Sequence, residues 1–161
     1  MSDAILNEVE MYGEVTLEVS KEKLKQVLSF LRPTYEVLMD LTGVDYLVPT
    51  KRTKVVYWLH NPVNLERIRV IVYAARNESL PTVIDLWEGA NWYERELYDL
   101  FGIRFDGHPD LTRILMPDDW TGHPLLKDYA LTEESVEFKH GVKPKVPSQI
   151  IPQGRFSTCQ E

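Results

Sequence analysis

The stretch from Ala90 to Gly102 constrains this chain most, because both of its ends carry helix-terminating signals. Asn91 is a residue type that caps a first helical turn, and Glu94 occupies the position from which a capping-box carboxylate reaches back. Gly102 can adopt the left-handed conformation that ends a helix. The sequence therefore predicts a short helix here, which separates a patterned region before it from an irregular region after it.

The predicted helix has one apolar face and one charged face. Tyr93, Leu97 and Leu100–Phe101 recur at the spacing of a buried stripe. On the remaining surface, Arg95 and Asp99 are four residues apart and can pair. Such pairs on a solvated helix contribute little, about 0.3–0.5 kcal/mol each. The charges by themselves therefore predict no particular function.

The region before this helix shows the periodicity of a strand and a further helix. Residues 15–19 alternate between apolar and polar side chains, which predicts a half-buried strand. In residues 24–31, apolar side chains recur at i, i+3, i+4 and i+7, which predicts a helix. Ser20 is expected to cap this helix, and Pro33 to stop it.

Further strands are predicted from three segments. Residues 35–46 fit a bent strand, or a short helix followed by a strand, whereas residues 55–60 and 67–74 fit strands alone. Short polar turns separate these runs, and such turns favour antiparallel neighbours. The strands are therefore expected to form a mostly antiparallel sheet.

A short helix is predicted over residues 80–89. Thr82 and Asp85 have the spacing of a capping box, and Gly89 can end the helix. The expected order is then β-α-β-β-β-α-α. This order predicts an α+β fold, with helices packed on a mostly antiparallel sheet and a long extended C-terminal arm after it.

Regular periodicity ends at Gly102, and six of the ten prolines follow that residue. We expect a compact α+β body of residues 1–101, then an extended segment of residues 102–131, which we call the C-terminal arm. The C-terminal arm contains many apolar side chains, which a polar linker would lack, so we expect it to dock on the body and on a partner. Residues 132–161 form a Pro-rich basic tail, in which residues 139–160 carry four basic residues and no acidic one.

Composition and motifs argue against several functions. The net charge of −7 argues against generic nucleic-acid binding. Cys159 is the single cysteine, so the chain cannot supply the four thiolates of an iron–sulfur cluster. Neither G-x-G-x-x-G nor a phosphate-binding loop motif occurs.

The longest apolar run, Val70–Ala75, is far shorter than the roughly 20 residues of a membrane-spanning helix. We expect no catalytic, cofactor-binding or metal site.

One cluster leaves a catalytic alternative open. Asp106, His108, Asp110 and His123 are potential metal ligands, and a stand-alone metal-dependent hydrolase could be built on them. Their spacing is not diagnostic, because no H-E-x-x-H or H-x-x-E-H pair occurs. The competing interpretation, that both histidines make structural hydrogen bonds beside prolines, is favoured.

The charged helix and the C-terminal arm together are typical of a docking surface. Arg, Trp and Tyr, which occur in both segments, are the residue types enriched at interface hot spots. The sequence therefore predicts contact with a partner protein through this region. The predicted partner-interface residues are Trp92, Glu94, Arg95, Glu96, Asp99, His108, Arg113, Trp120, His123, Lys127, Asp128 and Tyr129.

The same region resembles a known family. The matching runs are Ala90–Glu96, Tyr98–Asp99, Gly102–Leu111, Arg113–Met116, Trp120–Leu125 and Lys127–Tyr129, with Asp40–Tyr46 matching more loosely. In order and spacing these runs resemble the C subunit (NuoC-type) of proton-pumping NADH-quinone oxidoreductase, respiratory complex I. Thr112, Leu126 and Ala130 depart from that pattern, because the family often has arginine, arginine and proline there.

The resemblance implies a structural subunit of the hydrophilic arm of that complex. It implies a peripheral position on the cytoplasmic side of the inner (cell) membrane, against the D and B subunits. The complex transfers electrons from NADH to quinone and couples this to proton translocation. FMN, iron–sulfur clusters, NADH and quinone would all bind to partner subunits. The equivalent subunit of a membrane-bound hydrogenase or of a ferredoxin-fed complex is the alternative.

Overall fold

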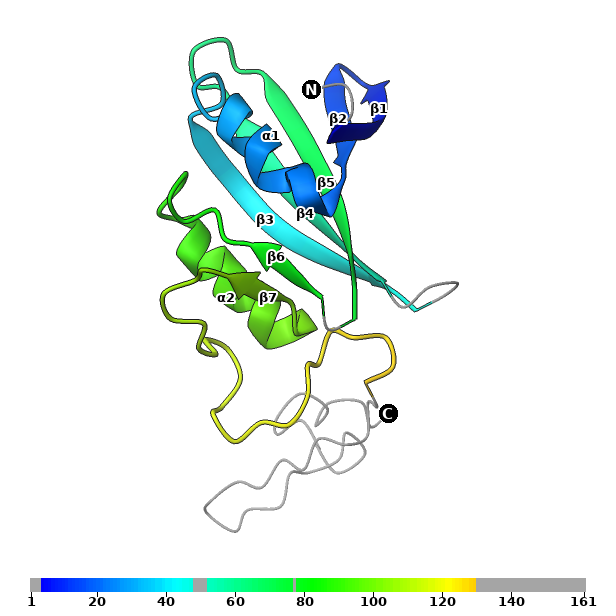
Figure 1. Ribbon diagram of the computed structural model, residues 1–161, viewed down its shortest axis with the longest axis vertical. Coiled ribbons are helices and arrows are strands. Elements are labelled where there is room, and N and C mark those ends of the chain that lie inside the picture. The colour runs from blue at the N-terminus through cyan, green and yellow to red at the C-terminus, as the bar shows by residue number, and fades with distance from the viewer. Residues whose placement is uncertain (1–3, 48–51, 77, 130–161) are drawn as a thin grey trace, which may run out of the picture. The chain divides into compact units, whose positions relative to one another are not determined.

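The computed structural model describes residues 4–47, 52–76 and 78–129, and Figure 1 shows the course of the chain. In chain order the elements are β1 (Ile5–Met11), β2 (Glu14–Val19), η2 (Lys21–Lys23), α1 (Leu24–Leu31), β3 (Val37–Tyr46), β4 (Arg52–His60), β5 (Arg67–Ala75), β6 (Ser79–Pro81), α2 (Ala90–Phe101) and β7 (Arg104–Asp106). No helix in these residues is long and apolar enough to cross a membrane. The predicted tail lies outside the described residues.

Five strands form one sheet in the order β1-β2-β5-β4-β3. Neighbouring strands are antiparallel, except that β2 and β5 run parallel and are joined by a long crossover. Strands β6 and β7 form a separate parallel pair. The predicted α+β class with a mostly antiparallel sheet is confirmed.

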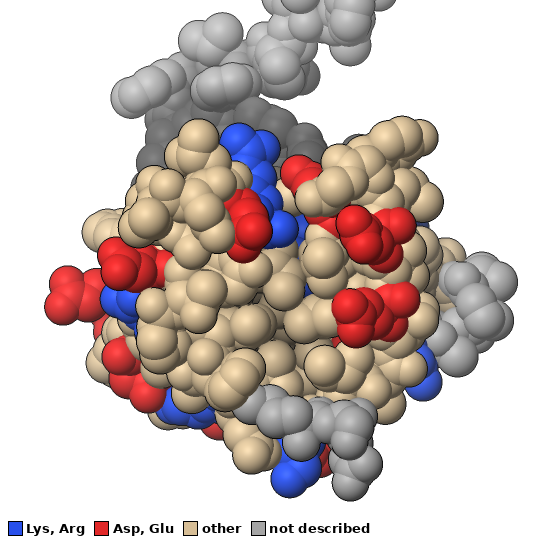
Figure 2. All heavy atoms as spheres, turned by 90° about the horizontal axis from the view of Figure 1, so that it is seen from above, with Lys and Arg blue, Asp and Glu red and all other residues tan. Residues whose placement is uncertain are grey.

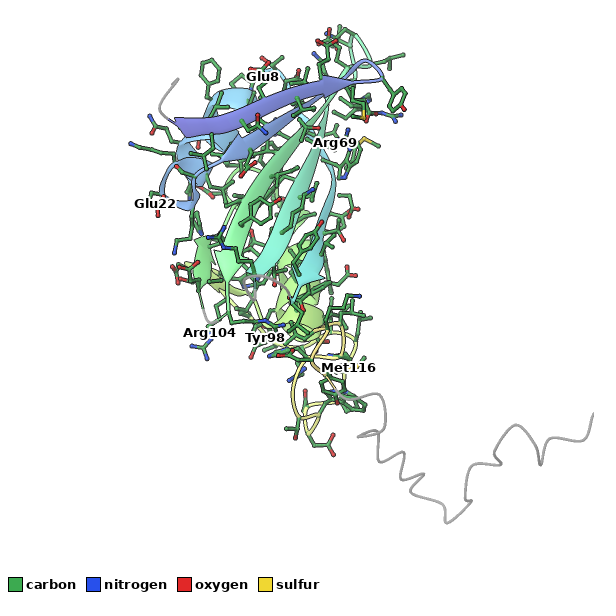
Figure 3. All side chains as sticks on the ribbon, turned by 90° about the vertical axis from the view of Figure 1, so that its right-hand side faces the viewer. Glu8, Glu22, Arg69, Tyr98, Arg104 and Met116 are labelled. Carbon is green, nitrogen blue, oxygen red and sulfur yellow. The ribbon has the colours of Figure 1, made fainter. Side chains whose placement is uncertain are left out.

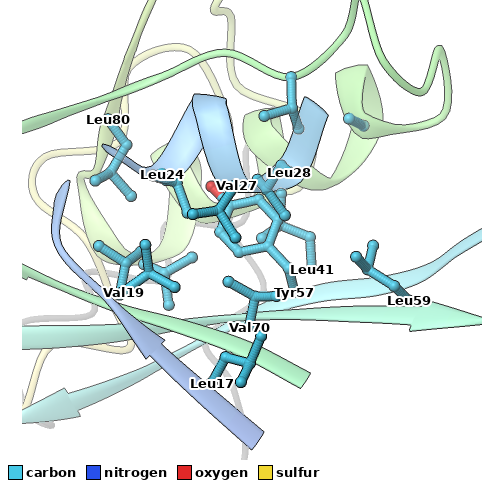
Figure 4. Close-up of a cluster of buried hydrophobic side chains, with 14 of the residues drawn as sticks. Leu17, Val19, Leu24, Val27, Leu28, Leu41, Tyr57, Leu59, Val70 and Leu80 are labelled. Atoms are coloured by element: carbon cyan, nitrogen blue, oxygen red, sulfur yellow. The ribbon is translucent and has the colours of Figure 1, made fainter. Parts of the chain in front are cut away.

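Both α-helices lie on the same side of the five-stranded sheet (Figure 1). The apolar stripe of α1, formed by Leu24, Val27 and Leu28, packs against Tyr57 and Val70 of the sheet (Figure 4). All five side chains are at most 3% exposed. This side of the sheet therefore carries the hydrophobic core, as the alternation along β4 and β5 requires.

The helix predicted over residues 24–31 is confirmed, but its start differs from the prediction. A 3-10 turn, η2, precedes it, and the Ser20 side chain makes no capping hydrogen bond. The Ser20 carbonyl accepts the bond instead, from the backbone N–H of Lys23 at 3.1 Å. The helix ends at Leu31, two residues before Pro33.

The ambiguous segment of residues 35–46 is a strand in the structure. β3 runs with a register shift between Leu38 and Asp40 and then pairs regularly with β4. A side chain at Gly43 would bring its Cβ within 2.9 Å of Cδ2 of Leu97 on α2. Glycine here therefore lets α2 lie closely against the edge strand of the sheet.

Two segments differ from their predicted structure. β1 is not predicted by the sequence pattern, because it is an edge strand whose side chains are mostly exposed and need not alternate. The short helix predicted over residues 80–89 is wrong. β6 occupies its beginning, and turns lead from there to α2. The Thr82 hydroxyl bonds to Glu94 and not to Asp85, so the expected capping box does not form.

Candidate functional site

Helix α2 has the predicted C-terminus but not the predicted N-terminus. Gly89 is the N-cap residue and no side chain caps the helix, so the capping role expected for Asn91 is wrong. At the other end, Gly102 has a φ of 74° and donates its N–H to the carbonyl of Tyr98 at 2.9 Å. The C-terminus of α2 is therefore fixed by the left-handed glycine that the sequence predicts.

Glu94 lies inside the molecule and not on a charged surface. Its Oε1 accepts the backbone N–H of Val83 at 2.8 Å, and its Oε2 accepts the hydroxyl of Thr82 at 2.7 Å. The carboxylate thus holds the turn that leads from β6 towards α2, and the predicted capping-box role is wrong. Burial raises the pKa of Glu94 to about 7, although the bonds from Val83 and Thr82 act in the opposite direction.

Asp99 is also fully buried, and it organises the first part of the C-terminal arm. Its Oδ2 accepts three successive backbone N–H groups, from Ile114 at 3.1 Å, Leu115 at 2.7 Å and Met116 at 2.9 Å. Its Oδ1 accepts a bond from Arg113 Nη1 at 2.7 Å. Burial alone would raise the pKa of Asp99, but these four bonds outweigh it and lower the pKa below its usual value.

The last carbonyls of α2 are covered by the C-terminal arm. The carbonyl of Asp99 accepts a hydrogen bond from Nδ1 of His123 at 2.9 Å, and the carbonyl of Leu100 accepts the N–H of Leu125 at 3.0 Å. The His123 ring lies so close to Gly102 that a Cβ there would be 2.6 Å from its Cδ2. Helix carbonyls that have no partner within the helix are thereby satisfied by the arm.

A third buried carboxylate, Asp45 at the end of β3, holds the far end of the arm. Its Oδ2 accepts Arg76 Nη2 at 2.8 Å and the backbone N–H of Lys127 at 2.8 Å. Arg76 also pairs with Asp128 at 3.1 Å. Asp45 and Arg76 are not among the predicted site residues, because these partners are separated from them by 31 to 82 positions in the sequence.

Arg95 does not pair with Asp99, contrary to the prediction. Its guanidinium bonds the carbonyl and hydroxyl of Thr112, at 3.1 and 3.0 Å, and reaches the carbonyl of Arg113 at 3.3 Å. It also stacks over the ring of Trp92, 5.1 Å from the ring centroid. Thr112, one of the departures from the family pattern, therefore serves as an acceptor for Arg95 within the chain.

The predicted interface residues divide into two groups in the structure. Glu94 and Asp99 have no exposed surface, so their predicted place on a charged outer surface is wrong. Trp92 is 62% exposed, and Glu96 is also exposed on α2. Figure 3 shows Tyr98 of α2 close to the arm, which carries Met116.

The predicted residues on the arm remain at least partly accessible. Lys127 and Asp128 are exposed, and His123, Trp120 and Tyr129 are partly buried. The Nε1 atom of Trp120 is buried without a hydrogen-bond acceptor in the described part of the chain. Tyr129 donates its hydroxyl to a backbone carbonyl at 3.4 Å. Partner contact by these residues remains a prediction.

The potential metal ligands do not converge. His108 uses Nδ1 to accept the N–H of Asp110 at 3.0 Å, and its Nε2 faces the carbonyl of Asn91 at 3.5 Å. His123 bonds the carbonyl of Asp99, as described above, and Asp106 accepts a side-chain bond at 2.6 Å. Within residues 4–47, 52–76 and 78–129, no group of three His, Cys, Asp or Glu side chains is arranged to hold a metal.

The chemistry of this region is therefore that of hydrogen-bond acceptors for the backbone. The buried carboxylates Glu94, Asp99 and Asp45 receive N–H and side-chain donors from segments without regular structure. The hydroxyl of Thr82, which is among these donors, is itself buried beside Glu94. The arrangement is suited to holding an irregular surface in one conformation.

Comparison with known proteins identifies the family. A family model for the 30 Kd subunit of respiratory-chain NADH dehydrogenase matches residues 17–135. The chain belongs to this family. The NADH-quinone oxidoreductase C subunit of Roseiflexus castenholzii is 46% identical over 143 residues, which cover 86% of this chain and 82% of that protein. The corresponding C subunit of Citrifermentans bemidjiense is 48% identical over 133 residues, covering 81% and 83%.

A solved structure shares the fold of this member of the 30 Kd subunit family. It comes from the membrane-bound sulfane sulfur reductase, an archaeal respiratory membrane complex. The superposition has a TM-score of 0.72 at 23% sequence identity and covers 80% of this chain and 79% of that chain. The similarity supports the α+β architecture described above.

Proposed function

We propose that this chain is a structural subunit of the hydrophilic arm of a membrane-associated NADH-quinone oxidoreductase. It supports electron transfer from NADH to quinone, coupled to proton translocation, by holding the faces of catalytic neighbours. The relatives named as C subunits of that enzyme match this chain over most of its length, which supports this role. FMN, iron–sulfur clusters, NADH and quinone bind to the other subunits in this proposal.

The observation that carries the proposal is that the carboxylates of α2 accept hydrogen bonds from other segments of this chain. Asp99 accepts four hydrogen bonds from the C-terminal arm, and Glu94 accepts two from the turn before the helix. Groups that are occupied in this way shape a surface and are not free to act on a substrate. The exposed residues on that surface, Trp92 first among them, are the types that dominate protein interfaces.

In this proposal, α2 and the C-terminal arm contact the D and B subunits on the cytoplasmic side of the membrane. The chain associates with the complex peripherally in this proposal, which the absence of a membrane-spanning helix from its described residues supports. Its role is therefore expected to be visible in assembly and not in the rate of the assembled enzyme.

The proposal is tested with Trp92→Ala and Arg95→Ala in a host that lacks its own copy of this subunit. Both variants are expected to lower the amount of assembled complex, while NADH–quinone turnover per assembled complex stays near that of the wild type. Val63→Ala, which alters an exposed apolar residue in the turn between β4 and β5, is the matched control. Normal assembly with collapsed turnover would contradict a structural role.

A second candidate is the equivalent subunit of a complex with another electron donor or acceptor. The shared fold with the sulfane sulfur reductase chain favours this candidate, whereas the relatives that are 46–48% identical favour NADH-quinone oxidoreductase. Mass spectrometry of the native complex separates the two, because the neighbouring subunits differ. Finding hydrogenase or ferredoxin-dependent subunits beside this chain would select the second candidate.

A further inference from the structure

The side of the sheet that faces away from α1 and α2 is not covered by any element of the described chain. The helices lie on one side (Figure 1), and the strand residues that point towards them are almost fully buried. The alternate residues point the other way. On β3, Val44 and Tyr46 on this second side are 42% and 45% exposed. We call this second side of β3, β4 and β5 the open face.

Apolar and aromatic side chains form the centre of the open face. The strand register places Val56 between Thr42 and Ile71, and Lys54 between Val44 and Tyr73. Val56 and Ile71 are each only 8% exposed, because larger neighbours flank them. The face therefore carries a strip of side chains whose aliphatic centre is already packed, and its accessible apolar surface lies towards the end that carries Val44 and Tyr46.

The arginine at the other end of this strip is incompletely satisfied. Arg69 lies over the ring of Trp58, 4.7 Å from its centroid, and its Nη2 is 3.4 Å from a carboxylate oxygen of Glu14. Its Nε is buried and has no hydrogen-bond acceptor among the described residues. Figure 3 places Arg69 and Glu22 on opposite sides of the sheet, so this group belongs to the open face. A buried donor without an acceptor is costly, and because Nε is shielded from solvent, a partner's carboxylate would contact the outer nitrogens of the partly exposed Arg69 side chain.

The two central strands of the open face carry only positive charge. The outward positions of β4 and β5 include Arg52, Lys54, Arg67 and Arg69 and no acidic residue, whereas the neighbouring outward positions carry Asp40 on β3 and Glu14 and Glu18 on β2. Acidic side chains are prominent on the side of the molecule that Figure 2 shows, and the whole chain has a net charge of −7. A basic stripe of this kind, on a chain that is acidic as a whole, is suited to a partner that presents apolar side chains together with carboxylates.

The open face is large enough for part of a specific contact. Its three strands, about 4.8 Å apart and about nine residues long, give an area of roughly 400 Å². One side of a standard protein interface buries about 800 Å². The basic segment of residues 139–160 is disfavoured as the occupant, because it has the same sign of charge as the face.

We propose that the open face binds a further subunit of the complex, in addition to those that contact α2 and the C-terminal arm, through an apolar surface bordered by Asp or Glu side chains. The proposed function assigns contacts only to α2 and the C-terminal arm, so a contact of the open face goes beyond it. The open-face proposal rests on the proposed function in one respect, namely that the chain is part of a multi-subunit complex. The chain then contacts neighbouring subunits on both sides of its sheet.

The first test couples amines to carboxylates with a carbodiimide in the purified intact complex. Lys54 is expected to form a cross-link with Asp or Glu of another subunit, which peptide mass spectrometry identifies. Lys54→Arg removes the reactive amine but keeps the charge, so the cross-link should disappear from this variant. Cross-links from Lys23, on the helix side of the sheet, serve as the control and should be unchanged. Coupling of Lys54 only to acids of this chain or of a second copy would overturn the proposal.

The second test measures access to the open face without requiring an ion pair. In a Cys159→Ser background, Val44→Cys is labelled with a maleimide in the intact complex and in the purified full chain. Labelling is expected to be about tenfold slower in the complex, because interface cores exclude solvent. Equal rates, with the chain present in the complex, would overturn the open-face proposal alone. Absence of the chain from any complex would instead contradict the proposed function.

Discussion

In the sheet, backbone ladders and apolar side chains fix the chain, whereas in the C-terminal arm buried carboxylates do so. β3, β4 and β5 pair over their full lengths, and their inward side chains are buried in the core. After β7 the described arm has no helix or strand, yet Asp99 and Asp45 gather its N–H groups. In the sheet many equivalent backbone bonds hold the strands. In the arm, Asp99 and Asp45 together accept four backbone N–H groups, beside a few isolated backbone bonds.

This difference predicts that single substitutions will affect the two regions unequally. Loss of one apolar contact in the sheet leaves the many other contacts of the neighbouring side chains in place. Loss of one carboxylate in or beside the arm leaves several donors without acceptors at once. The variants below test that inequality, beginning with the largest expected effect.

Asp99→Asn is expected to release the arm and to lower the free energy of unfolding by about 3–5 kcal/mol. The amide keeps one acceptor, so its NH2 group must face either Arg113 or the three backbone donors. Urea unfolding and limited proteolysis between residues 107 and 129 measure the effect. Asp110→Asn, at an exposed position of the arm, should change stability by less than about 0.5 kcal/mol. Equal behaviour of the two variants would refute the role given to Asp99.

Glu94→Gln is expected to remove a pH dependence and to leave the fold intact. The pKa of Glu94 is about 7 in the folded chain and near its ordinary 4.5 when unfolded, so the folded state binds more protons between these values. Wild-type stability should therefore fall as pH rises from about 4.5 to 7, by on the order of 2 kcal/mol. The amide can still accept from Val83 and bond Thr82, so the variant should lose this slope. Thermal unfolding between pH 5 and 8 tests this, and an unchanged slope would count against it.

Gly102→Ala is expected to destabilise the junction between α2 and the arm by about 2 kcal/mol. The added Cβ would lie 2.6 Å from His123 at a φ of 74°, so the ring must leave the carbonyl of Asp99. Gly89→Ala is the control, because nothing lies within 4 Å of its added Cβ. Thermal unfolding of both variants measures the difference. If Gly89→Ala proved the more harmful, the packing described for His123 would be wrong.

Thr112→Val is expected to have the smallest effect, about 0.5 kcal/mol. It removes the hydroxyl that accepts Arg95 Nη2, but leaves the backbone carbonyl that accepts Nε. The site is exposed, so water can replace the lost acceptor. Urea unfolding measures the stability, and Thr112→Ser should match the wild type. A loss comparable to that of Asp99→Asn would show that the arm depends on distributed contacts and not on its buried carboxylates.

The sequence pattern predicts those parts of the fold in which burial imposes a period. The alternation along residues 67–74 and the helical spacing along residues 24–31 each identify an element whose inward face is buried. The left-handed Gly102 is predicted for a local reason of another kind, because a positive φ at the end of a helix favours glycine. β1 lacks such a signal, since its side chains are mostly exposed.

The candidate site is less predictable, because its partners lie far apart in the sequence. Glu94 and Asp99 look like surface charges on a helical wheel, yet both are buried by segments 11 to 17 positions away. For Asp45, the partner Lys127 is 82 positions distant. Only the family resemblance in the arm marks this region as special before its geometry is known. Spacing within one helix cannot reveal which segment supplies the donors.

The bond between Asp45 and Lys127 also dictates an order of events during synthesis. When β3 leaves the ribosome, the residue that will donate to Asp45 has not yet been made, and 82 positions separate the two. A contact of such long range closes late, after the shorter loops of the sheet and of α2 have formed. Closure of the arm is thus the expected last step of folding. A chain that is truncated before the arm would leave the carboxylates of Asp45 and Asp99 without their donors.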